Sequence, residues 1–389
     1  MTLIQGNWLS DPAAQAVLSM LTGAGHQALV VGGCVRNALL ECPVNDVDIA
    51  TSARPDTVVE LAKSAGIKSV PTGIAHGTVT LVKDGLPFEV TTFRRDVETD
   101  GRRAVVAFAD TIDEDARRRD FTMNALYAQA NGTLVDPLGG LPDCLARRVV
   151  FIEDAEARVR EDYLRILRFF RFHAWYGDPL AGLDPDGLSA TAKLADGLCN
   201  LSRERVTSEI VKLLSAPDPA PAIAAMAKTG VLARVLPGAD AFALAPLVHL
   251  EAGLAPDAMR RLSVLGGFAG DRLRLSRAQS RALGNRTVAI ADMAPLKPLA
   301  FLKGFDVARD VALARAAMFE TPLAAGWQAE IKAASKAKFP VVATDLPPSL
   351  QGAAIGEALK KLQSLWIASD FHMTRGDLLI ALDAEQGGG

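Results

Sequence analysis

The pattern of hydrophobic and polar positions divides the chain into two parts. Before about residue 145, short apolar runs alternate with amphipathic stretches, which predicts a mixed α/β fold. Strands are expected at residues 28–31, 47–50, 77–82 and 88–93. The segment Lys83-Asp84-Gly85, between the last two, is typical of a β-hairpin turn.

Helices are expected where a polar residue and an early proline precede an amphipathic stretch. Asp11-Pro12 and Arg54-Pro55 are two such starts. From about residue 150 the strand signals stop, and residues 153–175, 201–214 and most of the remainder are expected to be helical. The sequence therefore predicts an α/β N-terminal part followed by an all-α part.

Composition narrows the class of protein. The 389 residues, 49% of them hydrophobic, are enough for two or three domains with real cores. We find no apolar stretch long enough to cross a membrane, no secretion signal and no Cys-x-x-Cys pair. We expect a soluble, cytoplasmic protein that needs no membrane and no obligate protein partner. The net charge of −3 does not indicate nucleic-acid binding by itself.

Asp46 and Asp48 are the most informative residues of the chain. In a strand, side chains two residues apart point to the same face, so these carboxylates are expected to lie side by side. Neighbouring carboxylates repel each other unless a cation lies between them. Oxygen ligands without nearby His or Cys favour a hard ion such as Mg²⁺.

The segment before this pair is typical of phosphate binding. A buried strand leads into Gly32-Gly33, and Arg36 follows at the start of a helix. Backbone N–H groups at such a turn can hold a phosphate, and an arginine adds a charged fork. Glu89 lies in a later apolar strand. It is either a third carboxylate of the site or a strand residue that faces solvent or pairs with an arginine.

Two further clusters carry charged residues. In the first, Arg119 is placed to bind phosphate, Asp120 to orient it, and Asn124 to bond nearby backbone or ribose; a solvated helix start is the alternative. The second is expected to be helical from residue 161 to 172. There Asp162 and Arg165 lie three residues apart on one helix face, and Arg168 and Arg171 continue the stripe. The alternative is a surface helix with ion pairs of little energy.

Together these segments resemble the class II tRNA nucleotidyltransferases, which include CCA-adding enzymes and bacterial poly(A) polymerases, in the polymerase-beta-like superfamily. Five segments, within about residues 25–215, carry the resemblance: residues 32–48, 118–125, 136–143, 161–172 and 202–212. Asn37 stands where the family usually has Asp after the arginine.

The resemblance implies a domain organisation. Residues 1–148 would form a nucleotidyltransferase head with the catalytic, metal and triphosphate sites. Residues 149–216 would form a helical neck that recognises the base. Residues 217–389 would form a helical body and tail that bind tRNA.

The implied activity is Mg²⁺-dependent addition of C, C and A to the 3′ end of tRNA from CTP and ATP, without a nucleic-acid template. Two Mg²⁺ ions would take part. The implied catalytic residues are Asp46, Asp48 and Glu89, the first two also as metal ligands. The implied nucleotide-binding residues are Gly32, Gly33, Arg36, Arg119, Asp120, Asn124, Asp162, Arg165, Arg168 and Arg171.

The choice of base has a physical explanation. Cytosine and adenine present an amino donor beside a ring-nitrogen acceptor, whereas uracil and guanine present a carbonyl acceptor beside an N–H donor. A carboxylate only accepts and a guanidinium only donates. Asp162 beside Arg165 is therefore expected to complement C and A.

Two more segments bear on the substrate. Residues 96–103 are polar and contain glycine, which predicts a mobile loop like the one the family uses when it switches from C to A. Residues 260–303 hold nine Lys or Arg against two acids, which predicts a basic helical patch for tRNA phosphates. The alternative for this segment is a solvated amphipathic helix.

Two other functions stay open. One is a poly(A) polymerase of the same fold, which would use ATP alone. The other is a non-catalytic RNA-binding protein on a decayed polymerase scaffold, against which Asp46, Asp48, Arg119 and Asp162 argue because all four are present.

Overall fold

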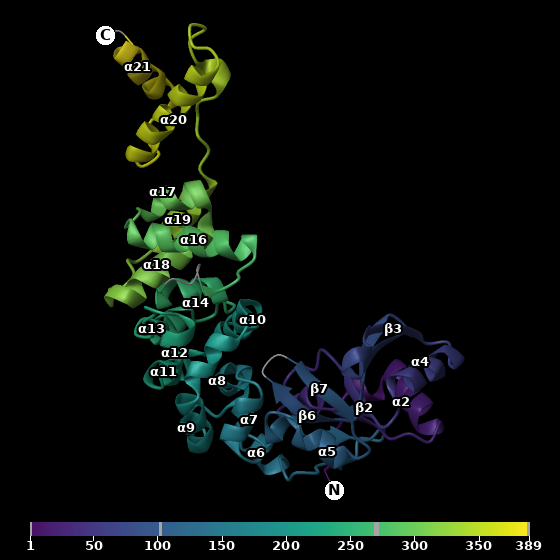
Figure 1. The fold of residues 1–389 in the computed structure, drawn as a ribbon. Helices are drawn as coiled ribbons and strands as arrows, with labels where there is room; N and C mark the ends of the chain where they lie inside the picture. Colours follow the sequence, from purple (N-terminus) through teal and green to yellow (C-terminus); the bar gives the residue numbers. More distant parts are fainter. Residues whose placement is uncertain (1, 101–102, 268–271, 387–389) are drawn as a thin grey trace. The chain divides into compact units, whose positions relative to one another are not determined.

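The computed structural model describes residues 2–100, 103–267 and 272–386 and divides into two compact units (Figure 1). Unit 1 comprises Met1–Ala239 and Asp271–Arg274, and unit 2 comprises Asp240–Gly270 and Leu275–Gly389. Within the described residues every named strand lies before residue 136, so the mixed α/β part followed by helices is confirmed. The finer boundaries expected at residues 148 and 216 fall inside unit 1 and stay a prediction.

A seven-stranded sheet forms the framework of the N-terminal part, in the order β3-β4-β5-β2-β1-β8-β9. Its strands are β1 (Ala28–Val31), β2 (Asp48–Thr51), β3 (Lys68–Gly73), β4 (Thr78–Lys83), β5 (Leu86–Thr92), β8 (Tyr127–Ala128) and β9 (Leu134–Val135). The central strand β2 pairs antiparallel with β1 and parallel with β5. Asp48 begins β2, so the sheet places this carboxylate at the end of a central strand.

The expected hairpin joins β4 to β5. Asp84 and Gly85 form the turn with φ angles of 51° and 83°, as a two-residue turn of this hand requires. The segment expected to be a loop at 96–103 belongs instead to a two-stranded ribbon, β6 (Arg94–Asp100) and β7 (Arg103–Phe108). Backbone hydrogen bonds between the two strands form here although the polar, glycine-containing sequence predicts a loop. Residues 101–102 lie outside the described residues.

Helices and short 3-10 helices surround the sheet and continue after it in unit 1. They are α1 (Asn7–Ser10), α2 (Pro12–Gly23), α3 (Gly33–Leu39), α4 (Pro55–Ser64), η1 (Ile74–His76), α5 (Ile112–Arg117), η2 (Thr122–Asn124), α6 (Leu141–Leu145), α7 (Ala155–Glu161), α8 (Leu164–Tyr176), α9 (Pro185–Lys193), η3 (Ala195–Asn200), α10 (Arg203–Leu214), α11 (Ala220–Lys228) and α12 (Val231–Val235). Both expected starts are confirmed: α2 has Asp11 as its capping residue, and α4 begins at Pro55.

The long helix expected over residues 153–175 is interrupted. Asp162 ends α7 in an extended conformation (φ −151°, ψ 104°), and α8 begins at Leu164. The Asp162 Oδ1 atom accepts a hydrogen bond from the Leu164 backbone N–H at 3.0 Å. This local bond competes with continuation of the helix. The prediction of one helix face shared by Asp162 and Arg165 is therefore wrong.

Aromatic packing joins α8 to the sheet-containing part. The Phe121 ring lies 4.9 Å from that of Phe151 and 5.0 Å from that of Phe172, measured between centroids. Phe169 stacks on Phe151 at 5.4 Å. Because Phe169 and Phe172 belong to α8, these contacts hold α8 in a defined position next to the sheet.

The named elements in the described part of unit 2 are all helices, joined by irregular segments. It contains α13 (Leu244–Leu250), α14 (Ala258–Leu265), α16 (Arg277–Ala291), α17 (Leu296–Lys303), α18 (Phe305–Phe319), α19 (Trp327–Lys336), η4 (Ala343–Asp345), α20 (Ala353–Ala368) and α21 (Arg375–Gln386). Trp366 is buried at the centre of an aromatic cluster near the C-terminal end. No helix in the described ranges has the length and apolar character needed to traverse a bilayer.

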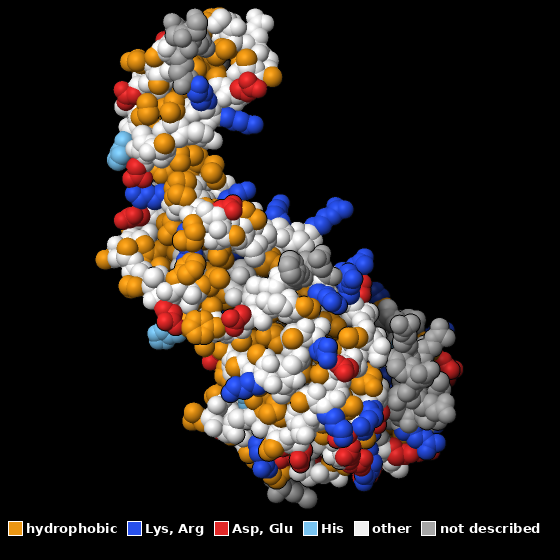
Figure 2. Space-filling model, turned by 60° about the vertical axis from the view of Figure 1, so that its left-hand side comes forward, with side chains coloured by type: hydrophobic (Ala, Val, Ile, Leu, Met, Phe, Trp, Pro, Cys, Tyr) orange, Lys and Arg blue, Asp and Glu red, His pale blue; other side chains and the backbone are white. Residues whose placement is uncertain are grey.

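The basic patch expected at residues 260–303 is only partly on the surface. Arg260, Arg261 and Arg286 are buried and form ion pairs with Glu251 and Asp310. These three guanidiniums neutralise buried carboxylates and are not available to RNA phosphates. On the face drawn in Figure 2, Lys and Arg side chains are interspersed with acidic and neutral groups.

Candidate active site

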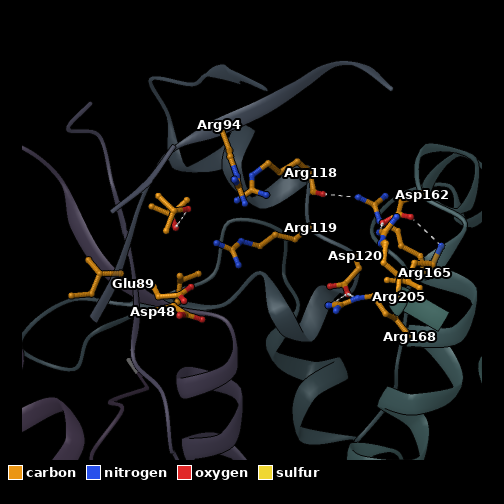
Figure 3. Close-up of a pocket in the computed structure, with 15 residues that line it drawn as sticks. Asp48, Glu89, Arg94, Arg118, Arg119, Asp120, Asp162, Arg165, Arg168 and Arg205 are labelled. Atoms are coloured by element: carbon orange, nitrogen blue, oxygen red, sulfur yellow. Dashed lines mark hydrogen bonds and ion pairs between the residues drawn. The ribbon is translucent and has the colours of Figure 1, made fainter. Parts of the chain in front are cut away.

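A polar pocket of about 480 Å³ lies in unit 1 between the sheet and helices α8 and α10. Figure 3 shows Asp48 and Glu89 on one side of it and Asp162, Arg165, Arg168 and Arg205 on the other, with Arg118 and Arg119 between them. The complete lining is Val31, Asp48, Ile49, Thr78, Glu89, Thr91, Arg94, Arg118, Arg119, Asp120, Asp162, Leu164, Arg165, Arg168 and Arg205. The carboxylate and the distant Asp162–Arg165 segment thus share one pocket.

Asp48 and Glu89 lie opposite each other in the parallel pairing of β2 with β5. Burial, followed by the negative charge of Glu89, raises the pKa of Asp48 to about 6, and the Arg119 charge opposes this shift. Asp46 adds a smaller effect of the same sign as Glu89. The fold therefore concentrates negative charge at this end of the pocket.

Asp46 does not lie on β2. It is an exposed residue of the irregular segment before Asp48, so strand alternation does not explain its position. It is also not among the residues that line the pocket, although its charge acts on Asp48. Loop closure between α3 and β2, rather than strand periodicity, places it.

The donor set suits a hard cation that takes its remaining ligands from elsewhere. Within the part of the chain that the structure describes, no group of three His, Cys, Asp or Glu side chains is arranged to hold a metal ion. Mg²⁺ usually takes only one or two carboxylates and completes its shell with water and substrate phosphates. Asp46 and Asp48 carry neighbouring negative charges, so they fit a Mg²⁺ ion that is bound by one or two carboxylates.

Hydrogen bonds to Asp115 and Tyr127 hold the Arg119 guanidinium in place in the pocket. Its Nη2 lies 3.0 Å from Asp115 Oδ2, and its Nε donates to the Tyr127 hydroxyl at 3.1 Å. The Tyr127 hydroxyl donates to the same Asp115 oxygen at 2.8 Å. A Cβ atom on Gly32, where φ is 71°, would lie 3.3 Å from Arg119 Nη1. The first glycine therefore gives the arginine room.

Asp115 is a supporting residue that our sequence reasoning missed. Its carboxylate is 1% exposed and pairs with both Arg118 and Arg119. Burial alone would raise its pKa, but the charges of Arg119 and Arg118 outweigh this and lower the pKa to about 2. The signal was available, because Asp115 precedes the two arginines by three and four residues, the spacing of helical ion pairs.

The structure does not bring Arg36 into the pocket. Its guanidinium is buried and donates to the amide oxygens of Asn37 and Asn124. It also lies 3.9 Å from the centroid of the Tyr176 ring. Four other predicted nucleotide-binding residues are likewise absent from the lining: Gly32, Gly33, Asn124 and Arg171. Arg171 bonds Glu209 Oε2 at 2.5 Å instead.

Asp162 pairs with an arginine of another helix. Its Oδ2 atom lies 2.7 Å from Nη2 of Arg205, which belongs to α10. Arg165 bonds elsewhere; its guanidinium donates to Glu161 Oε2 at 2.6 Å, to the Arg158 carbonyl at 2.9 Å and to the Arg118 carbonyl at 3.0 Å. Arg205 lies in the segment 202–212, which carries part of the family resemblance, but it was not among the predicted site residues.

Asp120 and Arg168 form a second ion pair in the lining. Arg168 Nε lies 2.7 Å from Asp120 Oδ2. Burial would raise the pKa of Asp120, but the Arg168 charge and a hydrogen bond from Asn124 lower it to about 2. Asp120 of the first charged cluster therefore bonds Arg168 of the second, although the two residues are 48 positions apart in the sequence.

Comparison with known proteins identifies two matching domains and several relatives. Residues 28–150 match the poly A polymerase head domain, and residues 182–242 match the probable RNA and SrmB-binding site of polymerase A. The chain is 41% identical over 234 residues to the CCA-adding enzyme of Geobacillus thermodenitrificans, covering 59% of this chain and 56% of that one. It is 39% identical over 201 residues to the human mitochondrial CCA tRNA nucleotidyltransferase 1, covering 51% and 46%. The aligned segments span about half the length of these relatives.

Solved structures share the fold over most of their length. The CCA-adding enzyme of Bacillus stearothermophilus in complex with CTP superimposes with a TM-score of 0.71 at 29% identity, covering 92% of this chain and 93% of that one. The Thermotoga maritima CCA-adding enzyme complexed with tRNA has a TM-score of 0.70 at 19% identity, covering 99% and 100%, and supports the fold alone. The chain thus contains a segment that matches the poly A polymerase head domain, and it shares the fold of the CCA-adding enzyme of Bacillus stearothermophilus.

Proposed function

We propose that this protein adds C, C and A to the 3′ end of tRNA from CTP and ATP, with release of pyrophosphate. One observation carries the proposal: a single pocket is lined by Asp48 at one side and by Asp162, Arg165 and Arg205 at the other. Nucleotidyl transfer needs negative charge for a cation at the reacting phosphate and selective groups at the base. The carboxylate of Asp48 supports the first role, and the carboxylate and arginines on the opposite side support the second.

The carboxylate side would hold magnesium, in our proposal as two ions with Asp46 and Asp48 as ligands. The chemistry that Mg²⁺ supplies when bound is charge neutralisation at the attacking and leaving oxygens. Glu89 contributes its charge next to Asp48 and stays a candidate catalytic residue. Burial of Asp48 keeps this carboxylate partly away from bulk water, which strengthens its attraction for a cation.

The middle of the pocket would hold the triphosphate and ribose. Arg119 is the principal candidate because Asp115 and Tyr127 fix its guanidinium while it lines the pocket. Arg118 and Arg94 line the same region and add positive charge. Arg36, Asn124 and Arg171 would act by holding these groups in place and not by touching the nucleotide.

The far side would select the base. Asp162 accepts hydrogen bonds and the arginines only donate, a pattern that complements cytosine and adenine and opposes uracil and guanine. Because Arg205 is the ion-pair partner of Asp162, we assign the donor role to Arg205 together with Arg165. A mismatched base would leave a partly buried charge unpaired, which costs about 1–3 kcal/mol.

The partner would be the acceptor arm of tRNA, bound in part by the helices of residues 217–389. Arg277 and Arg281 of α16 are exposed and remain candidates for phosphate contacts. Binding through such contacts should weaken as salt rises. We also infer a cytoplasmic location, which the four free thiols support.

The proposal is tested by sequencing the products formed from tRNA that lacks its CCA end, with all four nucleoside triphosphates and Mg²⁺. We expect one CCA per tRNA and no U or G. Long tails of A alone would indicate a poly(A) polymerase, which the relatives do not favour. No incorporation of any nucleotide would contradict both and support a non-catalytic RNA-binding protein.

A further inference from the structure

Arg36 is the centre of a hydrogen-bond chain that runs through the interior of unit 1. Its Nη1 donates to Asn124 Oδ1, while its Nε and Nη2 donate to Asn37 Oδ1 at 3.2 and 2.8 Å. Two neutral side-chain amides therefore share one buried guanidinium. An arginine has no acceptor, so both amides must turn their oxygen toward it and their NH₂ group away.

One arm of the chain reaches the segment that carries Asp46. Asn37 Nδ2 donates to the Pro43 carbonyl at 2.7 Å. Pro43 lies in the irregular stretch between α3 and β2, in which Asp46 also lies. This bond ties that stretch to α3 at a point three residues before the carboxylate.

The other arm reaches the far side of the pocket. Asn124 Nδ2 donates to Asp120 Oδ1 at 2.9 Å, and Asp120 accepts from Arg168 through its other oxygen. Arg168 lines the pocket from α8. The rings of Tyr176 and Phe172, also on α8, lie 3.9 and 5.1 Å from the Arg36 guanidinium.

We propose that Arg36, Asn37 and Asn124 form a positioning relay that sets the Asp46 segment relative to the Arg168 side of the pocket. The inference rests on the proposed function in assigning metal and base to these two sides. None of the three residues touches the pocket, so they are positioning residues and not catalytic ones.

The amide of Asn37 makes a second bond that an aspartate, the residue usual in the family at this position, could not make. An aspartate would still accept from Arg36, but it has no hydrogen to donate to the Pro43 carbonyl. Two acceptor oxygens would then face each other at this point. Asn124 is equivalent on the other arm, because an aspartate there would face the Asp120 carboxylate without a proton between them.

This symmetry permits a test in which each arm is cut separately. We would measure Mn²⁺ affinity by the electron paramagnetic resonance signal of the free ion, and the ratio of CTP to UTP affinity by calorimetry, both without tRNA. The variants are Asn37→Asp, Asn124→Asp and Arg36→Lys. Arg54→Lys is the matched control, because Arg54 also donates to a side-chain oxygen, that of Asp110, and lies over an aromatic ring, but at an exposed place outside the pocket.

We expect Asn37→Asp to weaken Mn²⁺ binding about tenfold, the effect of one lost hydrogen bond of ordinary strength, with the CTP-to-UTP ratio unchanged. Asn124→Asp should lower that ratio about tenfold and leave Mn²⁺ affinity unchanged. Arg36→Lys should change both, because an ammonium cannot bridge two amide oxygens through a planar fork. Arg54→Lys should change neither.

Equal changes in both properties for Asn37→Asp and Asn124→Asp would overturn the relay and indicate general loosening of the fold. Unchanged values in both variants would overturn it as well. If Arg36→Lys does not fold, the two asparagine variants decide. A wild-type chain that binds CTP and UTP equally would contradict the proposed function instead, and Mn²⁺ binding by Asn37→Asp would then decide the relay.

Discussion

Asp48 lies directly across from Glu89 where β2 and β5 run parallel, and this pairing places two negative side chains at the same end of one pocket. Burial and the Glu89 charge together raise the pKa of Asp48 to about 6. The two carboxylates stay close in spite of their repulsion because the backbone pairing fixes the register of both strands. A bound cation would relieve it, which couples the stability of the fold to metal binding.

The first prediction concerns pH. A carboxyl whose pKa is higher in the folded than in the unfolded chain contributes stability that is fully present below about pH 4 and is lost as the pH rises through about 6. We therefore expect the free energy of unfolding to fall as the pH is raised from about 4 to about 6 in the absence of divalent ions. Asp48→Asn should remove this part of the decrease, and Mg²⁺ should oppose it in the wild type.

Urea unfolding at several pH values checks this expectation. Asp110→Asn, at an exposed carboxylate of the same unit, is the control and should keep the wild-type slope. The Asp48 variant should fold but lose at least about 100-fold in C addition, because several kcal/mol of charge stabilisation are removed. An Asp48→Asn protein with the full pH slope would contradict the assignment.

The second prediction concerns base selection by Arg205. Removing its charge with Arg205→Gln leaves Asp162 without its 2.7 Å partner and should reduce discrimination of CTP against UTP by about 10- to 100-fold. The measurement is kcat/KM for each nucleotide on tRNA lacking its CCA end. Lys212→Gln, an exposed cation on the same helix, should retain wild-type discrimination. Wild-type discrimination in Arg205→Gln would refute the role given to this arginine.

The third prediction separates backbone strain from close approach at Gly32. Gly32 and Gly25 both have positive φ angles, 71° and 85°, so alanine at either should cost at least about 1–2 kcal/mol of stability. Only at Gly32 does the new Cβ meet Arg119 Nη1, at 3.3 Å; at Gly25 nothing lies within 4 Å. We expect the rate of C addition by Gly32→Ala to be about tenfold lower than that of Gly25→Ala, because only at Gly32 must Arg119 move. Equal rates in the two variants would show that this contact is unimportant.

The fourth prediction concerns the buried ion network of unit 2. The fully buried Asp310 accepts from Arg260, Arg286 and Arg309. Asp310→Asn leaves these cations short of a counter-charge and should cost about 3–5 kcal/mol of unfolding free energy. Asp306→Asn, whose carboxylate is 75% exposed and pairs with Arg309, should change stability by less than about 0.5 kcal/mol. Thermal unfolding of the two variants provides the comparison, and similar midpoints would be contrary to this account.

Local pattern alone determined much of the fold. The uninterrupted apolar run at Ala28–Val31 is strand β1 to the residue, and the Asp84-Gly85 turn joins two paired strands as expected. Both features depend on side-chain periodicity and on backbone conformations that neighbouring residues set. Some of the residues predicted for the site, Asp48 and Arg119 among them, also line the pocket, because chemistry at phosphate and metal uses few kinds of side chain.

The partners of those residues were decided only by the tertiary structure. Asp162 pairs with Arg205 across 43 positions, Arg36 turns inward to amides and rings of α3, η2 and α8, and Arg260 and Arg286 neutralise buried carboxylates instead of facing solvent. Spacing along a helix shows which neighbours an arginine has on its own element. It does not show which distant carboxylate or ring the packed chain brings within 4 Å of that arginine, because this depends on how the helices and the sheet pack against each other.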